Sequence, residues 1–286
     1  ELVKPPLYYL EGMAELFGTH RLLPGGGVEF RDLPEDPHVA VGFGRIEMLQ
    51  RAIRAGRGKT LVDVLELSAQ DFTESRSDPY AWSWALCKWL DTHPYYRERF
   101  CRLAEHRNGA EFRRAFASAF HADRHRLETE WQLFVRALDY GYDIERGAIE
   151  FVPCAAPVAG STTQVEVRAD RGWQSTGLVL TAGRHYEIMA TGEVTLADTP
   201  KPWLSQPDGI TIRYAGGFPL GRLVATIVPD AGDDAAPPPE SFAVIDLGQR
   251  ATLRPAHSGC LFLRVNDHWY SLDNNRDQYA VQITSP

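Results

Sequence analysis

The residues best suited to chemistry lie near the C-terminus, in the stretch VNDHWYSLDNN. Its side chains with hard oxygen donors are Asp267, Asp273, Asn274 and Asn275, and Ser271 adds a backbone carbonyl. Calcium takes about six to eight oxygen ligands in a loosely constrained geometry, whereas zinc normally requires histidine or cysteine. The stretch is therefore a candidate calcium site. Taken by itself it is more typical of an ordinary turn, since Asp and Asn readily form turns without any ligand.

This polar stretch lies between two strand-like segments, LFLRV and YAVQI. After about residue 150, apolar residues alternate with polar ones in short runs that end at glycine or at a polar turn. Further runs of this kind are TQVEVRA, TGLVLTAG, HYEIMATG and GITIRYAG. Several short strands at this spacing predict a β-sandwich or jelly roll, with the polar stretch at one of its ends.

The first half of the chain instead shows helical spacing of its apolar residues. The segment LYYLEGMAELFG follows two prolines and ends at Gly18, an order that predicts one helix. Further helices are predicted for YAWSWALCKWLDTH, for NGAEFRRAFASAF with Asn108 as its N-cap, and for DRHRLETEWQLFVRALD. The first half is therefore predicted to be an all-α helical bundle.

These patterns predict a multidomain α and β protein. We expect a helical domain over residues 1–142, a linker over residues 143–163 and a β-sandwich over residues 164–286. The linker contains FVPCAAPVAGSTT, whose small residues and prolines show no periodicity. The acidic segment PDAGDDAAPPPE is interpreted as a solvated loop inside the second domain.

The composition argues against two classes of partner. The chain has 30 Lys and Arg against 38 Asp and Glu, a formal net charge of −8, which disfavours nucleic acid. No apolar run approaches the roughly 20 residues that a transmembrane helix needs. The oligomeric state stays open.

The four cysteines are Cys87, Cys101, Cys154 and Cys260, and they form no C-x-x-C pair. This spacing argues against a zinc knuckle and against a thioredoxin-like motif. We expect buried thiols. A pair between Cys87 and Cys101 stays open for the case in which their helices face each other.

From TQVEVRADRGWQSTGLVLTAG to the C-terminus, about 120 residues, the chain resembles the galactophilic PA-I lectin family of calcium-dependent β-sandwiches. The resemblance is strongest in VNDHWYSLDNN. It implies that Asp267, Asn274 and Asn275 donate side-chain oxygens to calcium, while Ser271 and Leu196 contribute backbone carbonyls. In that family, vicinal hydroxyls of a bound sugar complete the calcium shell, so the resemblance implies binding of galactose-like carbohydrate rather than catalysis.

One segment departs from the lectin pattern. After the dipeptide PW, the lectins present a histidine and a glutamine to the sugar, whereas this chain has SQPDG. Gln206 or Asp208 is the expected substitute, and Trp203 is a candidate apolar wall for the sugar, beside Asp267, Asn274 and Asn275. Galactose specificity is therefore not fixed by the resemblance.

The helical half resembles part of a gluzincin metallopeptidase of the peptidase MA-like type. The segment LYYLEGMAELFGTHR is similar to the helix that carries the third zinc ligand, which implies that role for Glu11. The segment DPYAWSWALCKWL is similar to the helix start where related aminopeptidases place a tyrosine that stabilises the oxyanion, which implies that role for Tyr80.

No H-E-x-x-H motif occurs in the sequence, and one carboxylate cannot hold zinc or activate water alone. Either the histidine helix lies upstream of Glu1, or the lineage has lost the chemistry. His121 and His125 are four residues apart but have arginine neighbours and no glutamate between them, which favours a solvated helix face. The chain as given is therefore expected to be inactive, with Zn²⁺ bound only if the missing helix is present.

Together these resemblances imply the C-terminal part of a secreted or envelope-associated bacterial metallopeptidase-like protein that carries a calcium-dependent carbohydrate-binding module. Two alternatives stay open. One is a zinc metallopeptidase whose histidine segment lies outside this chain. The other is a non-catalytic structural or interaction protein, whose sandwich binds calcium for stability but binds no sugar.

Overall fold

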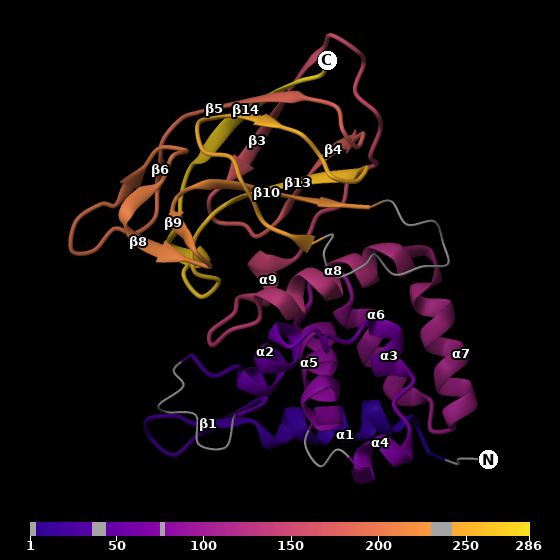
Figure 1. Cartoon of the computed structure of the whole chain (residues 1–286). Helices are drawn as coiled ribbons and strands as arrows, with labels where there is room; N and C mark the ends of the chain where they lie inside the picture. The colour runs from indigo at the N-terminus through magenta and orange to yellow at the C-terminus, as the bar shows by residue number, and fades with distance from the viewer. Residues whose placement is uncertain (1–3, 36–43, 75–77, 230–241) are drawn as a thin grey trace. The chain divides into compact units, whose positions relative to one another are not determined.

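The computed structural model describes residues 4–35, 44–74, 78–229 and 242–286. Contacts divide the chain into two compact units, Glu1–Glu145 and Arg146–Pro286. The first unit is mainly helical and the second consists of antiparallel strands (Figure 1). Of the segment PDAGDDAAPPPE, every residue after Pro229 lies outside the described residues.

The first unit contains helices and one small hairpin. In chain order these elements are α1 (Leu7–Gly18), β1 (His20–Leu22), β2 (Val28–Phe30), α2 (Arg45–Arg54), α3 (Leu61–Leu65), α4 (Ala69–Glu74), α5 (Asp78–Thr92), α6 (Arg97–Arg102), η1 (Leu103–Glu105), α7 (Gly109–Phe120), η2 (His121–Asp123) and α8 (Arg124–Ala137). Helix α9 (Ile144–Gly147) spans the sequence position at which the two units divide. The predicted helices are confirmed, and the Asn108 side chain caps α7 by accepting a hydrogen bond from the Ala110 amide at 2.9 Å.

Helix α5 is the centre of the first unit. It is buried on all sides, as expected for a helix whose apolar residues are not confined to one face. Its partner α1 crosses it closely at Gly12, where a Cβ atom would lie only 2.6 Å from the sulfur of Cys87. The rings of Trp89 and Phe134 stack with centroids 5.8 Å apart, and Trp131 lies 5.7 Å from Trp89. Aromatic packing therefore fixes α8 against α5.

The prediction of an all-α first domain is wrong in one segment. Strands β1 and β2 pair antiparallel, with His20 opposite Phe30. The turn between them contains Gly25 and Gly26, whose φ angles of 101° and 91° suit glycine and few other residues. A three-residue strand is too short to show a period of two in its sequence, so the pattern alone cannot identify it.

The second unit is built from short antiparallel strands. They are β3 (Thr162–Arg168), β4 (Gln174–Leu180), β5 (Tyr186–Thr191), β6 (Val194–Thr195), β7 (Leu204–Ser205), β8 (Ile210–Ala215), β9 (Phe218–Leu220), β10 (Leu223–Val228), β11 (Ile245–Asp246), β12 (Arg250–Leu253), β13 (Gly259–Val265) and β14 (Gln278–Thr284). The strands predicted from alternation are confirmed as β3, β4, β5, β8, β13 and β14.

Two four-stranded sheets of the second unit enclose its core. Their strand orders are β11-β10-β13-β4 and β12-β5-β14-β3. Inward side chains from both sheets form one cluster, which includes Leu180, Leu263, Tyr279 and Ile283. This arrangement is a β-sandwich. Strand β10 was not among the predicted strands, because all six of its residues are buried and its sequence LVATIV shows no alternation.

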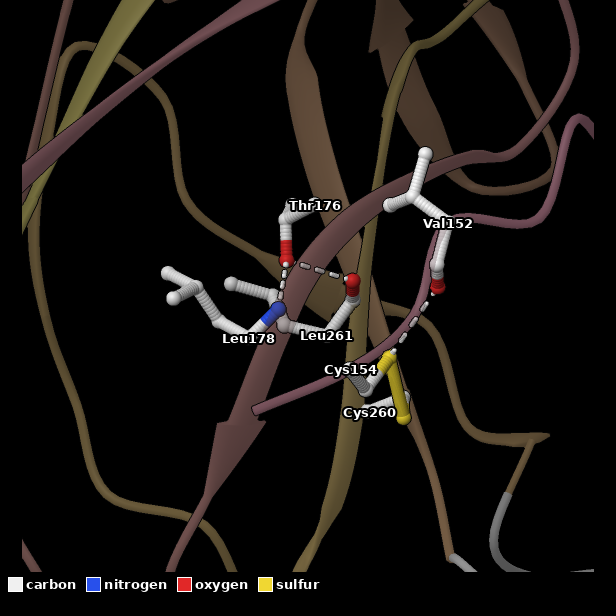
Figure 2. The surroundings of a disulfide bond; sticks show 6 residues. All are labelled: Val152, Cys154, Thr176, Leu178, Cys260 and Leu261. Carbon is white, nitrogen blue, oxygen red and sulfur yellow. Dashed lines mark hydrogen bonds between the residues drawn. A yellow bond between two sulfur atoms is a disulfide. The ribbon is translucent and has the colours of Figure 1, made fainter. Parts of the chain in front are cut away.

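A segment at the start of the second unit is fastened to β4. The amide of Ala155 donates to the Gly177 carbonyl, and the amide of Val179 donates to the Ala155 carbonyl, both at 2.9 Å. A disulfide joins Cys154 to Cys260 on β13 (Figure 2). Part of the sequence assigned to a linker therefore runs beside β4, where Ala155 forms an isolated parallel bridge with Leu178.

A bulge in β4 makes this attachment possible. Three residues of β4, from Thr176 to Leu178, lie opposite Leu261 alone. The Thr176 hydroxyl donates to the Leu261 carbonyl at 2.8 Å and accepts from the Leu178 amide, so it replaces part of the ladder (Figure 2). Gly177, with a φ of 72°, turns its backbone toward the added segment.

The expectation of four buried thiols is wrong. Cys154 and Cys260 form the disulfide, and Cys101 is a free, exposed thiol. Only Cys87 is a buried thiol as expected. Burial raises the pKa of Cys87 above its ordinary range, so it stays protonated and serves as a small apolar residue.

Candidate functional site in the loop between β13 and β14

The loop from Asn266 to Asp277 joins β13 to β14 and so crosses from one sheet to the other. The side-chain amide of Asn266 fixes the start of the loop by donating to the carbonyls of Ala215, Phe218 and Pro219 at 2.9 to 3.1 Å. These bonds hold the β8–β9 hairpin against the loop, at one end of the sandwich (Figure 1).

Asp267 is the buried carboxylate of this loop. The residue is only 3% exposed to solvent. One of its carboxylate oxygens, Oδ1, accepts a hydrogen bond from the His268 amide at 2.7 Å. The other oxygen, Oδ2, is buried and has no hydrogen-bond partner among the described residues. Burial raises the pKa of Asp267, against the opposing effects of the His268 amide, the Asn275 side chain and the Arg264 charge.

Asn275 is the second buried polar residue, also 3% exposed. Its Nδ2 group donates to the Ala169 carbonyl at 3.2 Å. Its Oδ1 atom is buried and, within the part of the chain that the structure describes, accepts no hydrogen bond. A buried oxygen without a partner costs folding free energy, on the order of 1–3 kcal/mol for a neutral group. Either a hydrogen-bond donor such as a bound water or a cation would satisfy the two oxygens.

A backbone bridge between Thr195 and Arg276 brings Leu196 next to the loop that holds Asn275. Thr195 and Arg276 exchange amide-to-carbonyl hydrogen bonds at 3.1 and 2.9 Å in an antiparallel bridge. In such a bridge the next residue of one chain segment faces the preceding residue of the other, so Leu196 lies opposite Asn275. The structure thus places the backbone of Leu196 next to Asn275, and the calcium role of these residues stays a prediction.

Ser271 and Asn274 lie in the same loop but in a different setting. The Ser271 amide donates to the His268 carbonyl at 3.0 Å, which closes a turn, and the short helix η4 (Leu272–Asn274) follows. Leu272 is fully buried and anchors this helix, whereas Asn274 is exposed to solvent. The side-chain amide of Asn274 is therefore available at the surface of the loop.

The residues predicted to contact the sugar differ in whether their side chains are already hydrogen-bonded within the protein. Gln206 is exposed, and its carbonyl accepts from the Gly209 amide at 2.8 Å. Asp208 is also exposed, but its Oδ1 atom accepts from the Gln249 amide at 2.9 Å and pairs with Arg222. Its carboxylate therefore already serves the turn before β12.

Trp203 packs partly against the sandwich core. The guanidinium carbon of Arg213 lies 4.5 Å from the centre of the Trp203 ring. This cation–π contact covers part of the indole, so an apolar wall at Trp203 would include the stem of Arg213.

Arg264 is a residue of this site that sequence patterns miss. Its guanidinium donates to the Asp267 carbonyl and lies 3.7 Å from the centre of the Trp269 ring and 6.0 Å from that of Trp173. The residue is 5% exposed. In the alternating segment LFLRV an arginine is expected to face solvent, and in the sequence only Trp269, five residues later, hints at a stacked, buried position.

The donor set fits calcium better than zinc. Among the described residues, no three His, Cys, Asp or Glu side chains gather in a way that could hold a metal ion. The loop instead offers one buried carboxylate, that of Asp267, together with amide oxygens and backbone carbonyls, a set that suits a hard cation with many oxygen ligands. The two buried oxygens without partners, Asp267 Oδ2 and Asn275 Oδ1, match this requirement in the described structure.

The two residues predicted for peptidase chemistry lie on the packed helices of the first unit. Glu11 is half-buried on α1, and Tyr80 is half-buried near the start of α5, where its ring meets Phe72 edge-on at 5.0 Å. A hollow of about 350 Å³ in this unit is lined by residues of α6, η1 and α7, which are Arg99, Arg102, Leu103, Glu105, His106, Ala115 and Ala119. Neither Glu11 nor Tyr80 lines it.

None of the helices in the described part of the chain is both long and apolar enough to cross a bilayer. No family model matches the chain, and no curated protein matches it. Among solved structures, the chain is similar to one titled "EclA N-terminal domain; PllA-like lectin". The two are 20% identical, and the similarity covers 43% of this chain and 95% of the other, with a TM-score of 0.33.

Proposed function

We propose that the second unit binds carbohydrate through a calcium ion held in the loop between β13 and β14. The observation that supports this most is the pair of buried oxygens, Asp267 Oδ2 and Asn275 Oδ1, which lack hydrogen-bond partners among the described residues. A divalent cation satisfies such oxygens and removes the cost of burying the ionised carboxylate of Asp267.

In this proposal Asp267, Asn274 and Asn275 supply side-chain oxygens, while Ser271 and Leu196 supply backbone carbonyls. Two vicinal hydroxyls of a sugar complete the calcium shell. A cation that is already partly coordinated by protein orients both hydroxyls at once, which explains how a single loop can select a sugar. Galactose-like sugars are the first class to test.

Neighbouring residues complete the proposed sugar site. Gln206 is free to donate from its exposed amide, and Trp203 contributes apolar surface. Asp208 is the weaker candidate, because its carboxylate is engaged with Arg222 and Gln249. A direct role for Asp208 would require these bonds to break.

The disulfide supports a location outside the reducing cytosol. Cys154 and Cys260 form a bond of a kind that persists mainly in secreted and envelope proteins. We therefore propose a secreted or envelope location. A zinc role for Glu11 and an oxyanion role for Tyr80 stay predictions that depend on a histidine-bearing segment outside this chain.

Calorimetric titration of the full chain tests the proposal. After removal of metal with EDTA, calcium should bind with about one ion per chain, and methyl galactoside or another pyranoside should then bind only when calcium is present. Asp267→Asn should abolish both signals, because it removes the only carboxylate of the proposed calcium shell. The matched control is Asp273→Asn, an exposed aspartate in the same loop, which should behave as wild type.

The possible outcomes distinguish a calcium-dependent sugar site from a structural calcium site and from an ordinary turn. Unchanged calcium binding in Asp267→Asn would overturn the proposed site. Calcium binding without heat from any sugar of a broad panel would overturn the carbohydrate function and favour the alternative of a calcium-stabilised interaction protein. If wild type binds no calcium, the proposed site is wrong and the loop is an ordinary turn.

A further inference from the structure

Two aromatic rings stand beside the proposed calcium site. The rings of His268 and Tyr270 stack almost parallel, at an angle of 14° and with centroids 4.9 Å apart. Tyr270 is 52% exposed, an unusual state for a tyrosine ring that is also held in place. Both residues lie between Asp267 and Asn275 in the sequence, inside the loop that would hold the ion.

The stack is tied to the proposed calcium ligand. The backbone amide of His268 donates to Asp267 Oδ1 at 2.7 Å, and the turn that follows is closed by the bond from the Ser271 amide to the His268 carbonyl. The position of the two rings is thus set by the same backbone that presents Asp267.

The three aromatic residues of this turn, His268, Trp269 and Tyr270, differ in their packing. Trp269 packs inward: its ring lies on the Arg264 guanidinium, and a Cβ atom on Gly172 would come within 2.8 Å of the indole. Tyr270 does not share this packing and is exposed instead. Trp269 therefore accounts for the stability of the turn, and the exposed ring of Tyr270 is left for another task.

We propose that Tyr270, supported from behind by His268, contacts the apolar C–H face of a pyranose whose vicinal hydroxyls bind the calcium ion. The inference rests on the proposed function and adds the ligand class: ring-form sugars, rather than open-chain polyols that offer only a pair of hydroxyls. A pyranose exposes polar hydroxyls at its edge and C–H groups on a face. The negative face of an aromatic ring attracts C–H groups and shields them from water.

The stack with His268 holds the Tyr270 ring in place for the proposed sugar contact. A lone exposed tyrosine loses side-chain entropy when a ligand orders it, which weakens binding. The stack with His268 restricts the Tyr270 ring before the ligand arrives. The aromatic contact then adds to the affinity that the cation supplies.

The test compares two ligands of matched stereochemistry, methyl galactoside and the open-chain alcohol galactitol, in competition and calorimetric assays on the full chain. Wild type should prefer the pyranoside. Tyr270→Ala should weaken the pyranoside about fivefold to tenfold, and should leave the affinity for calcium and the weaker affinity for galactitol unchanged. Tyr270→Phe should bind both ligands as wild type does, because the ring rather than the hydroxyl makes the contact.

A matched control comes from the helical unit. Tyr95 has the same exposure as Tyr270, 52%, and also contacts a histidine, with its ring centroid 5.7 Å from that of His93. Tyr95→Ala should leave sugar binding unchanged. A Tyr270→Ala variant that binds calcium and methyl galactoside like wild type would overturn this inference and leave the proposed function intact. Failure of wild type to bind any pyranoside in calcium would overturn both.

Discussion

Asp267 and Asn275 lie at opposite ends of one loop, and each buries a side-chain oxygen that has no hydrogen-bond partner in the described structure. The remaining polar atoms of the two side chains are satisfied, by the His268 amide and by the Ala169 carbonyl. Each residue is therefore held in position by half of its side chain while the other half stays unsatisfied. This division favours a role in binding over a role in forming the turn.

The first prediction is a reversal of stability with calcium. Without calcium, Asp267→Asn should be at least as stable as wild type, because it removes a carboxylate whose ionised form is disfavoured by burial. With calcium at about 100 times its Kd, wild type should gain about 2.7 kcal/mol and the variant almost nothing. Thermal unfolding in EDTA and in calcium measures both effects. Equal calcium shifts for the two proteins would contradict the assignment.

Alternation and turn residues are enough to predict the strands that have one face on the core, such as β3 and β14. They are not enough for β10, whose two faces are both buried, or for the bulge at Gly177, which only the added segment at Ala155 explains. Helix ends follow from local chemistry, as the Asn108 cap shows. Local sequence patterns do not predict contacts between segments that are distant in the chain.

The same limit applies to the site. Asp267 and Asp273 are equivalent in the sequence pattern, since both are aspartates in one polar loop. The structure distinguishes them, because Asp267 is buried and Asp273 is exposed. The burial of Asn275 likewise depends on Ala169, which is 106 residues away in the chain. Residue types could therefore predict the chemistry of the loop, but not which of its oxygens are buried.

The second prediction concerns the pH dependence of the helical unit. Burial raises the pKa of Glu128 above its ordinary value of 4.5, although the Leu61 amide and the Gln132 side chain partly oppose this effect. For an acid with a raised pKa in the folded state, stability is full below pH 4.5 and falls as the pH rises through the folded pKa. Glu128→Gln should remove this loss, so its stability relative to wild type should improve between about pH 4 and pH 7.

Urea unfolding at several pH values, followed by tryptophan fluorescence, measures the difference. Glu111→Gln on the exposed face of α7 is the matched control and should show no such change. A constant difference between Glu128→Gln and wild type across this pH range would show that the pKa of Glu128 is the same in the folded and unfolded states, so that burial does not raise it in solution.

The third prediction tests the crossing of α1 and α5. Gly12→Ala should destabilise the helical unit by about 1–3 kcal/mol, because the added methyl overlaps the Ser83 carbonyl and the Cys87 sulfur. Gly18→Ala on the same helix is the control, since a Cβ atom there meets no described atom within 4 Å. Denaturant unfolding should separate the two variants. Equal stability would show that the helices do not cross as closely as the structure indicates.

The fourth prediction concerns the attachment of the segment beside β4. The disulfide between Cys154 and Cys260 closes a loop of 106 residues in the unfolded chain. Replacing both cysteines by alanine should lower the stability of the sandwich by about 2–4 kcal/mol, since the unfolded state gains conformational freedom. A reductant should have the same effect on wild type and none on the double variant. Cys101→Ala, which removes an exposed free thiol, should leave stability unchanged. If the reductant leaves wild type unchanged and the double variant is as stable as wild type, the bond does not form in solution, and the hydrogen bonds of Ala155 hold the segment to Gly177 and Val179.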